Sequence, residues 1–392
     1  MAFAPTQSRL AAADRLREAW KPAGLWMAAH LLIFGVALTA RAVGFGPAAG
    51  HALRSPADLF FHWDSAYFAG IAQVGYFGQG SNATWPAFFP GFPLAGRLLL
   101  ALTGDLHPTH GQEVASLGLV ALVASLIAAL LIWRLAQREY GDRVAAAATL
   151  LFVAGPYSVF LVAPYSEPMF VAFGIGAWLL AERGRWWQAG LLGAFACLTR
   201  IEGVFLVAGL GVAVAVDLRR RGAPFLLRSL GTLAIGSIGL LAYWGALWAW
   251  TGNPTEWFAA ERAGWHRSLS WPWVSLANTV GAIFTAHPLS HQVQNAVDLL
   301  FAALFVAAIV VLVRRRAWAA VTFVGLIAAA MMTSTTYLSI ARASVVLFPV
   351  TVLVAGTVLE RRRRWIYWTA LAGGGALLIV NTVLFVNGIW VD

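Results

Sequence analysis

The chain has 392 residues, of which 60% are hydrophobic and 11% charged, and its mean hydropathy is +0.73. The net charge of +10 is almost all arginine, since Lys21 is the only lysine, and arginines placed in loops orient a membrane protein and do not by themselves indicate nucleic-acid binding. The single cysteine, Cys197, excludes an intrachain disulfide and a cysteine-ligated metal cluster. Apolar runs of about 20 residues, enough to cross a bilayer core as helices, predict an all-α polytopic membrane protein.

The first predicted span covers residues 23–43 and follows a basic N-terminal segment, residues 1–22, which we expect in the cytoplasm. Residues 44–112 then form a first outer loop. Within that loop, residues 87–103 begin with several prolines, which indicates an interrupted entry and a re-entrant or interfacial helix. Further spans are predicted at 114–135, 143–162 and 168–182.

Residues 187–216 form an apolar run that is too long for one span and has arginines at both ends. If both ends are cytoplasmic, the run must be a hairpin of two short helices, with its apex at Thr199–Gly203. Each arm of about 13 residues would reach only about 20 Å, and irregular backbone at that depth must be buried in protein or line a cavity.

Five more spans and one more loop complete a single membrane domain, residues 1–392, with about 11 transmembrane helices. A second large outer loop is predicted at 251–293. The remaining spans are predicted at 226–250, 294–313, 317–335, 341–359 and 365–386. Most arginines then fall on inner turns, which places both long loops on the outer face.

Phe60–Phe68, in the first outer loop, places Asp64 among aromatic residues and next to His62 and Trp63. In one interpretation, Asp64 is a general base or a ligand-binding acid at the outer membrane surface. In the other, Asp64 caps the N-terminus of an interfacial helix. This segment alone leaves both interpretations open.

Two further carboxylates and an arginine lie in the predicted spans or at their ends. Ionisable groups at membrane depth are costly and usually mark a site, so Arg200 and Glu202 at the hairpin apex are candidates for substrate binding. The alternative is a buried ion pair that joins the two half-helices. Glu167, at the outer start of a span, could bind substrate or interact favourably with the helix dipole.

The outer loops also carry positive charge. Arg262, His266 and Arg267 would suit an anionic group, because guanidinium forks match phosphate oxygens, and anionic lipid headgroups would suit them as well. Arg342 begins a predicted span, where its charge opposes the helix dipole and favours an anionic partner. The sequence has no Asp-x-Asp pair and no phosphate-binding glycine loop, so we expect neither a metal nor a cofactor.

Several motifs resemble those of one family. Phe61–Ser65, Ile71-Ala72, Gly75-Tyr76 and Ala87–Pro93 resemble the first outer loop of PIG-V-type mannosyltransferases, which belong to the GT-C superfamily of polytopic glycosyltransferases. Tyr165–Glu167 and Thr199-Arg200 with Gly203 resemble later motifs of the family, so the resemblance covers roughly residues 55–205. The chain departs from the family at Ile201-Glu202, where Ser-Asn is usual.

The resemblance implies an inverting transfer of mannose from a polyprenyl-phosphate donor to a glycolipid or glycan acceptor, on the extracytoplasmic side, with Asp64 as the base. The abundance of Ala, Gly and Arg, with a single lysine, is typical of a G+C-rich bacterial genome, so a bacterial plasma membrane is expected. The main alternative is a membrane transporter or lipid flippase; a non-catalytic scaffold is a third. The residues expected to bind substrate are His62, Trp63, Tyr165, Glu167, Arg200, Glu202, Arg262, His266, Arg267 and Arg342.

Overall fold

The structure, a computed structural model, describes residues 19–48, 53, 56–104, 108–222, 224–360 and 364–391. Within these ranges the regular elements are all helices, and the only β pairing is an isolated bridge between Leu269 and Ser334. The all-α prediction is therefore confirmed. Most of the predicted N-terminal segment, residues 1–22, lies outside the described residues.

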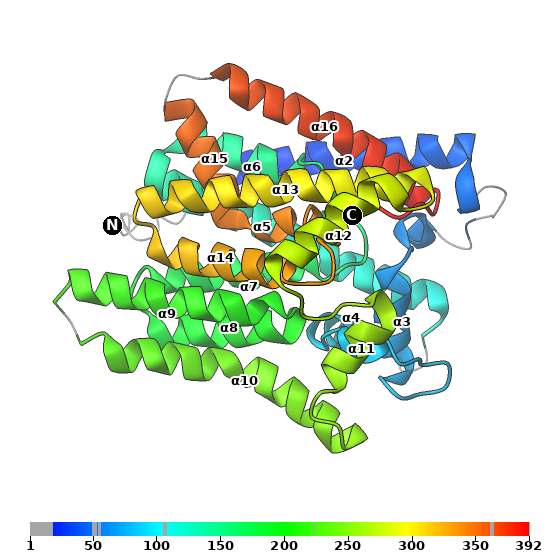
Figure 1. The fold of residues 1–392 in the computed structure, drawn as a ribbon, viewed down its shortest axis with the longest axis horizontal. Coiled ribbons are helices and arrows are strands. Elements are labelled where there is room, and N and C mark those ends of the chain that lie inside the picture. Colours follow the sequence, from blue (N-terminus) through cyan, green and yellow to red (C-terminus); the bar gives the residue numbers. More distant parts are fainter. Residues whose placement is uncertain are drawn as a thin grey trace, which may run out of the picture.

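Five of the described helices are long and apolar enough to cross a membrane. They are α2 (Trp20–Val43), α5 (His110–Tyr140), α10 (Leu226–Thr251), α13 (Leu289–Arg314) and α16 (Arg364–Val386). Shorter helices lie among them and run in broadly the same direction in Figure 1: α6 (Asp142–Val153), α7 (Glu167–Ala181), α8 (Trp186–Thr199), α9 (Glu202–Arg220), α14 (Trp318–Met332) and α15 (Phe348–Glu360). The total of about 11 spans stays a prediction, because these helices other than α9 have only 12 to 15 residues and are short for a full crossing.

The predicted break in residues 187–216 is present. Arg200 is extended, with φ −157° and ψ 153°, and separates α8 from α9. The helices have 14 and 19 residues, so the second arm is longer than the 13 expected. Gly203 allows the tight return, because a Cβ there would lie 2.4 Å from the Cα of Cys197.

Segments of the two predicted outer loops lie together at one end of the bundle (Figure 1). The first loop contributes α3 (Asp64–Val74), the short η3 (Trp85–Ala87) and α4 (Gly91–Leu102); the second contributes α11 (Glu256–Trp265) and α12 (Pro272–Thr285). Helix α11 lies on η3, where Trp257 Nε1 donates to the carbonyl oxygen of Ala87 at 3.2 Å. Residues 87–103 thus contain a helix, α4, that starts after Pro90 and packs on α5.

Two predicted spans are interrupted next to this end. Residues 143–162 are not one helix, because α6 ends at Val153, before Gly155 and Pro156, and the chain continues as the 3-10 turn η4 (Ser158–Leu161). Residues 341–359 likewise begin as the 3-10 turn η5 (Arg342–Val346) before α15. Arg342 therefore does not begin an α-helix, and the dipole argument made for it does not apply.

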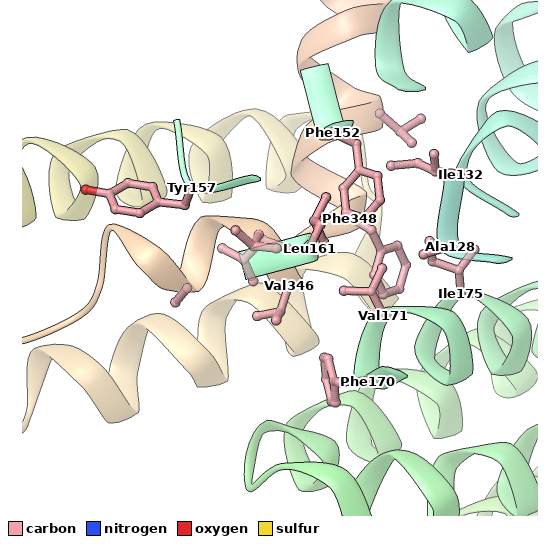
Figure 2. Close-up of a cluster of buried hydrophobic side chains, with 14 of the residues drawn as sticks. Ala128, Ile132, Phe152, Tyr157, Leu161, Phe170, Val171, Ile175, Val346 and Phe348 are labelled. Atoms are coloured by element: carbon pink, nitrogen blue, oxygen red, sulfur yellow. The ribbon is translucent and has the colours of Figure 1, made fainter. Parts of the chain in front are cut away.

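Both 3-10 turns are held by the apolar core. Figure 2 shows side chains from α5, α7, α6, η4 and η5 meeting in one cluster. Leu161 and Val346 are fully buried in it, as are Phe170 of α7 and Phe348 of α15. A close-packed core resists displacement of its members, so the irregular segments beside it are held in place.

Candidate active site

Asp64 and Arg342 form a nearly buried ion pair. Arg342 Nη1 donates to Asp64 Oδ2 at 2.8 Å, and each residue is 8% exposed. Asp64 is the first residue of α3, and no side chain caps that helix. The capping interpretation of Asp64 is therefore wrong, and its carboxylate is directed at a cation from the other half of the chain.

The backbone turn before Asp64 is strained, and hydrogen bonds hold it in place. Trp63 has φ 57° and ψ −118°, which residues other than glycine rarely adopt. The buried hydroxyl of Tyr165 donates to the carbonyl oxygen of His62 at 3.0 Å and accepts from the backbone N–H of Asp64 at 3.2 Å. Tyr165 thus holds both sides of the turn and fixes the direction in which Asp64 leaves it.

Glu167 joins two arginines behind Asp64. It is 1% exposed, and its Oε1 accepts from Arg342 Nε at 2.7 Å and lies 2.9 Å from Arg200 Nη1. Its Oε2 is buried with no hydrogen-bond partner among the described residues. A buried carboxylate is tolerated only with paired charge, so Glu167 depends on both guanidinium groups.

Arg200 closes the network on the other side. Its Nε and Nη2 donate to the two oxygens of Glu202 at 3.2 and 2.9 Å, and its Nη1 donates to Ser166 Oγ at 3.2 Å. Arg200 therefore makes the ion pair that joins the two helices of the hairpin, and its side chain also lines a cavity in front of Asp64.

This cavity has a volume of about 130 Å³. Asp64, Arg200 and Arg342 line one side, and α11 with the residues after it covers the other. Aromatic side chains supply much of the remaining wall, namely Phe68, Phe88, Phe89, Trp257, Trp265 and Trp390. The Arg342 guanidinium also lies over aromatic faces, 4.5 Å from the centroid of Phe160 and 4.9 Å from that of Tyr165.

Six residues expected at the site do not line the cavity. Tyr165 and Glu167 are two of them and lie in the network described above; the other four are more distant from the ion pairs. The ring of His62 packs edge-to-face on Phe385, and burial, followed by the charge of Arg41, lowers the pKa of His62. Trp63 packs edge-to-face on Trp390. Arg262 and His266 are exposed, because Glu261 and Trp265, one helical turn apart on α11, take the face toward the cavity.

Glu261 is the site residue that the sequence did not single out. It lines the cavity opposite Asp64, where burial raises its pKa against the lowering effect of Arg267. Arg267 Nη1 lies 3.6 Å from Glu261 Oε2, and Arg267 Nη2 donates to the carbonyl oxygen of Leu338 at 3.0 Å. A glutamate next to an arginine in a loop carries no sequence signal that separates it from a surface pair.

Carboxylates outnumber arginines at the site by four to three. The positive groups are Arg200, Arg267 and Arg342, and the negative groups are Asp64, Glu167, Glu202 and Glu261. Within the described ranges, no group of three or more His, Cys, Asp or Glu side chains is placed to hold a metal ion. An anionic ligand would have to exchange with existing carboxylate contacts.

Residues 52–219 match the family described as Mannosyltransferase (PIG-V). The GPI alpha-1,6-mannosyltransferase 2 of Mus musculus is 38% identical over 149 residues, which are 36% of this chain and 29% of that protein. The GPI mannosyltransferase 2 of Chaetomium globosum is 32% identical over 157 residues, 36% of this chain and 32% of that protein. The match thus spans about three tenths of these relatives.

Among solved structures, the oligosaccharyltransferase of Archaeoglobus fulgidus in the apo form aligns with a TM-score of 0.45 and 11% identity, over 92% of this chain and 55% of that chain. The sequence match contains Asp64, Tyr165, Glu167, Arg200 and Glu202. The other wall of the cavity, with Glu261, Arg267 and Arg342, comes from the part of the chain beyond residue 219.

Proposed function

We propose that the chain is a glycosyltransferase that moves a mannose from a polyprenyl-phosphate donor to a hydroxyl of a glycolipid or glycan acceptor, because residues 52–219 match the PIG-V mannosyltransferase family. The observation that carries the proposal is the nearly buried Asp64 at the wall of a cavity that arginines and aromatic rings also line. In this proposal the cavity lies on the extracytoplasmic side of a bacterial plasma membrane, in a GT-C-like bundle whose N-terminus is cytoplasmic.

Asp64 is the base of the proposed reaction. The described hydrogen bonds use its Oδ2 and leave Oδ1 to accept the proton of the acceptor hydroxyl. The acceptor oxygen then bonds to C1 of the mannose while the bond from C1 to the phosphate oxygen breaks, and that oxygen keeps the electron pair. The lipid phosphate leaves on the face opposite the attack, so a single displacement inverts the anomeric centre.

The arginines divide into two roles. The guanidinium of Arg342 donates hydrogen bonds to both Asp64 and Glu167, so Arg342 positions the base. Arg267 is more available, because its side chain is 33% exposed and its contact with Glu261 is long at 3.6 Å. Arg200, like Arg342, is held by carboxylates. We therefore assign Arg267 to the donor phosphate, where a fixed positive charge stabilises the leaving group.

The opposite wall suits a sugar on the acceptor. Trp257 and Trp265 offer apolar aromatic faces, and Glu261 offers carboxylate oxygens that accept hydrogen bonds from hydroxyl groups. An acceptor that carries a sugar would use both kinds of contact, whereas a bare alkyl alcohol has a single hydroxyl group, which the reaction itself uses.

Incubation of the purified chain with radiolabelled polyprenyl-phosphate mannose and a membrane lipid extract tests the proposal. The expected result is a labelled glycolipid or glycan that does not form with Asp64→Asn. A transporter or lipid flippase would move labelled lipid across a vesicle membrane and form no new labelled product. That outcome would overturn the proposal.

A further inference from the structure

A second cavity, of about 400 Å³, lies at the opposite end of the bundle from Asp64. Its wall includes residues from the end of α9 and the start of α14. The wall of the Asp64 cavity includes residues from the start of α9 and the end of α14. Figure 1 shows the end of α9 and the start of α14 on the side away from α3, α4 and α11. The 19 residues of α9 separate the two cavities by about 28 Å, so the second cavity needs a ligand of its own.

The second cavity is rich in arginine. Residues from α5, α9 and the turn between α13 and α14 contribute Arg138, Arg220, Arg315 and Arg316. Arg315 donates to the hydroxyls of Tyr140 at 2.8 Å and Thr357 at 2.9 Å, which are uncharged. Among the described residues, no ion pair or side-chain hydrogen bond engages Arg220 or Arg316, so two guanidinium groups can bind an anion.

The carboxylates at the cavity do not cancel this charge. Arg138 Nη1 donates to Glu182 Oε2 at 3.3 Å, and Trp178 Nε1 donates to Glu182 Oε1 at 3.0 Å. Asp217 Oδ1 accepts from Arg221 Nη2 at 2.9 Å. The third carboxylate, Glu139, is exposed to solvent.

Arg316 occupies a backbone position that glycine would fill more comfortably. Its φ is 56°, its N–H donates to the carbonyl oxygen of Val313 at 2.9 Å, and the next N–H, of Ala317, donates to that of Leu312 at 3.0 Å. These bonds end α13 with a left-handed residue, which is usually glycine. An arginine at this position costs conformational energy. We therefore infer that its guanidinium group has a role that glycine could not fill.

Part of the cavity wall is apolar. Trp178, Leu312 and Val352 line it and are at most 6% exposed, while Trp318, which also lines it, is 49% exposed. Arginines around apolar side chains match a molecule with a charged head and an apolar body. Basic pockets between transmembrane helices bind anionic lipid headgroups in this way, whereas free phosphate would gain nothing from the apolar wall.

We propose that this second cavity binds the headgroup of an anionic phospholipid, with Arg220 and Arg316 on its phosphate and its glycerol and upper acyl chain against the apolar wall. Two charge-assisted hydrogen bonds fix the head. The site is independent of the proposed sugar transfer, and its test needs no enzymatic reaction.

The test uses the full chain, delipidated in detergent, and native mass spectrometry with added phosphatidylglycerol, phosphatidylcholine or inorganic phosphate. Wild type is expected to retain one phosphatidylglycerol at least about tenfold more tightly than phosphatidylcholine. The double variant Arg220→Gln/Arg316→Gln is expected to lose this preference. The matched control, Arg219→Gln/Arg314→Gln, removes two exposed arginines beside the cavity and is expected to keep it.

The variant Arg316→Gly distinguishes a loss of lipid binding from a loss of folding stability. Glycine relaxes the positive φ, so thermal stability in phosphatidylcholine should be unchanged or higher while phosphatidylglycerol retention falls. Equal loss in the cavity pair and the control pair would mean diffuse attraction to a basic face and would overturn the proposal. Binding of inorganic phosphate, with no preference for phosphatidylglycerol over phosphatidylcholine, would overturn the lipid assignment.

Discussion

Arg342 Nη1 lies 2.8 Å from Asp64 Oδ2, although 278 residues separate the two in the chain. One comes from the segment that matches the PIG-V mannosyltransferases, and the other from the part beyond it. Glu167 holds the same guanidinium from behind through Nε at 2.7 Å. The base of the proposed reaction is therefore oriented by a residue outside the region of recognisable similarity.

Asp64→Asn should abolish mannosyl transfer while the protein still folds. The amide keeps the shape of the side chain but cannot accept the proton of an acceptor hydroxyl, so the turnover should fall by about 10²–10⁴-fold. The measurement is transfer of labelled mannose at saturating donor. Asp142→Asn, at an exposed contact with Lys21, is the control and should keep near-normal turnover; similar losses in both variants would contradict the assignment.

Arg342→Gln should lower stability more than Arg267→Gln. Removing Arg342 leaves Asp64 without its cation and Glu167 with Arg200 alone, and breaking a buried pair costs about 3–5 kcal/mol. Arg267 is one-third exposed and its pair is long, so its removal should change stability by less than about 1 kcal/mol. Thermal unfolding in detergent checks both.

The same two variants should differ in kinetics. Arg267→Gln should raise the KM for the polyprenyl-phosphate donor by about tenfold, because a guanidinium–phosphate contact is lost. Arg342→Gln should lower kcat, since Asp64 is no longer oriented. An unchanged donor KM in Arg267→Gln would show that the phosphate binds elsewhere.

Tyr165→Phe should lower kcat by about tenfold through loss of positioning. The change removes the hydroxyl that clamps His62 and Asp64 across the strained Trp63, and it leaves a buried N–H without its partner at a cost of about 1–3 kcal/mol. Tyr367→Phe, which removes a buried hydroxyl near Ala147, is the control. It should affect thermal stability and leave kcat unchanged.

Glu261→Gln should stabilise the protein increasingly as pH rises. Burial raises the pKa of Glu261 in the folded state, so folding favours the protonated form. The free energy of unfolding therefore falls as the pH rises above the unfolded-state pKa, and it levels off once the pH exceeds the folded-state pKa. The variant cannot ionise. Its melting temperature should match wild type near about pH 4 and exceed it near about pH 8; a constant difference would contradict burial as the cause.

The sequence predicted the parts of the site that depend on local chemistry. Apolar lengths and a charged interruption located the break at Arg200, and acidic residues in apolar surroundings identified Asp64 and Glu167, since polar groups there must have a function or a partner. Loop charges were less informative. Arg262 and His266 differ from Glu261 and Arg267 only in the face of α11 and the direction of the chain after it.

The sequence analysis offered the Arg200–Glu202 pair as an alternative, and the structure contains it. The ion pairs between distant segments could not be predicted, because they depend on how those segments meet. Arg342 and Asp64 approach through two 3-10 turns and a strained residue, none of which hydropathy distinguishes from a continuous span. Glu167 was expected either to bind substrate or to interact with a helix dipole, and in the structure it bridges two arginines.

The shared carboxylate of Glu167 also bears on how the protein assembles. Apolar packing gives membrane helices little drive to associate in lipid, so polar contacts carry much of the specificity of assembly. Arg342, Arg200 and Glu167 bring together η5, the junction of α8 and α9, and the start of α7. A chain that has not brought these segments together would expose unpaired charge to lipid, which is costly. The shared carboxylate therefore disfavours misassembled arrangements of these helices.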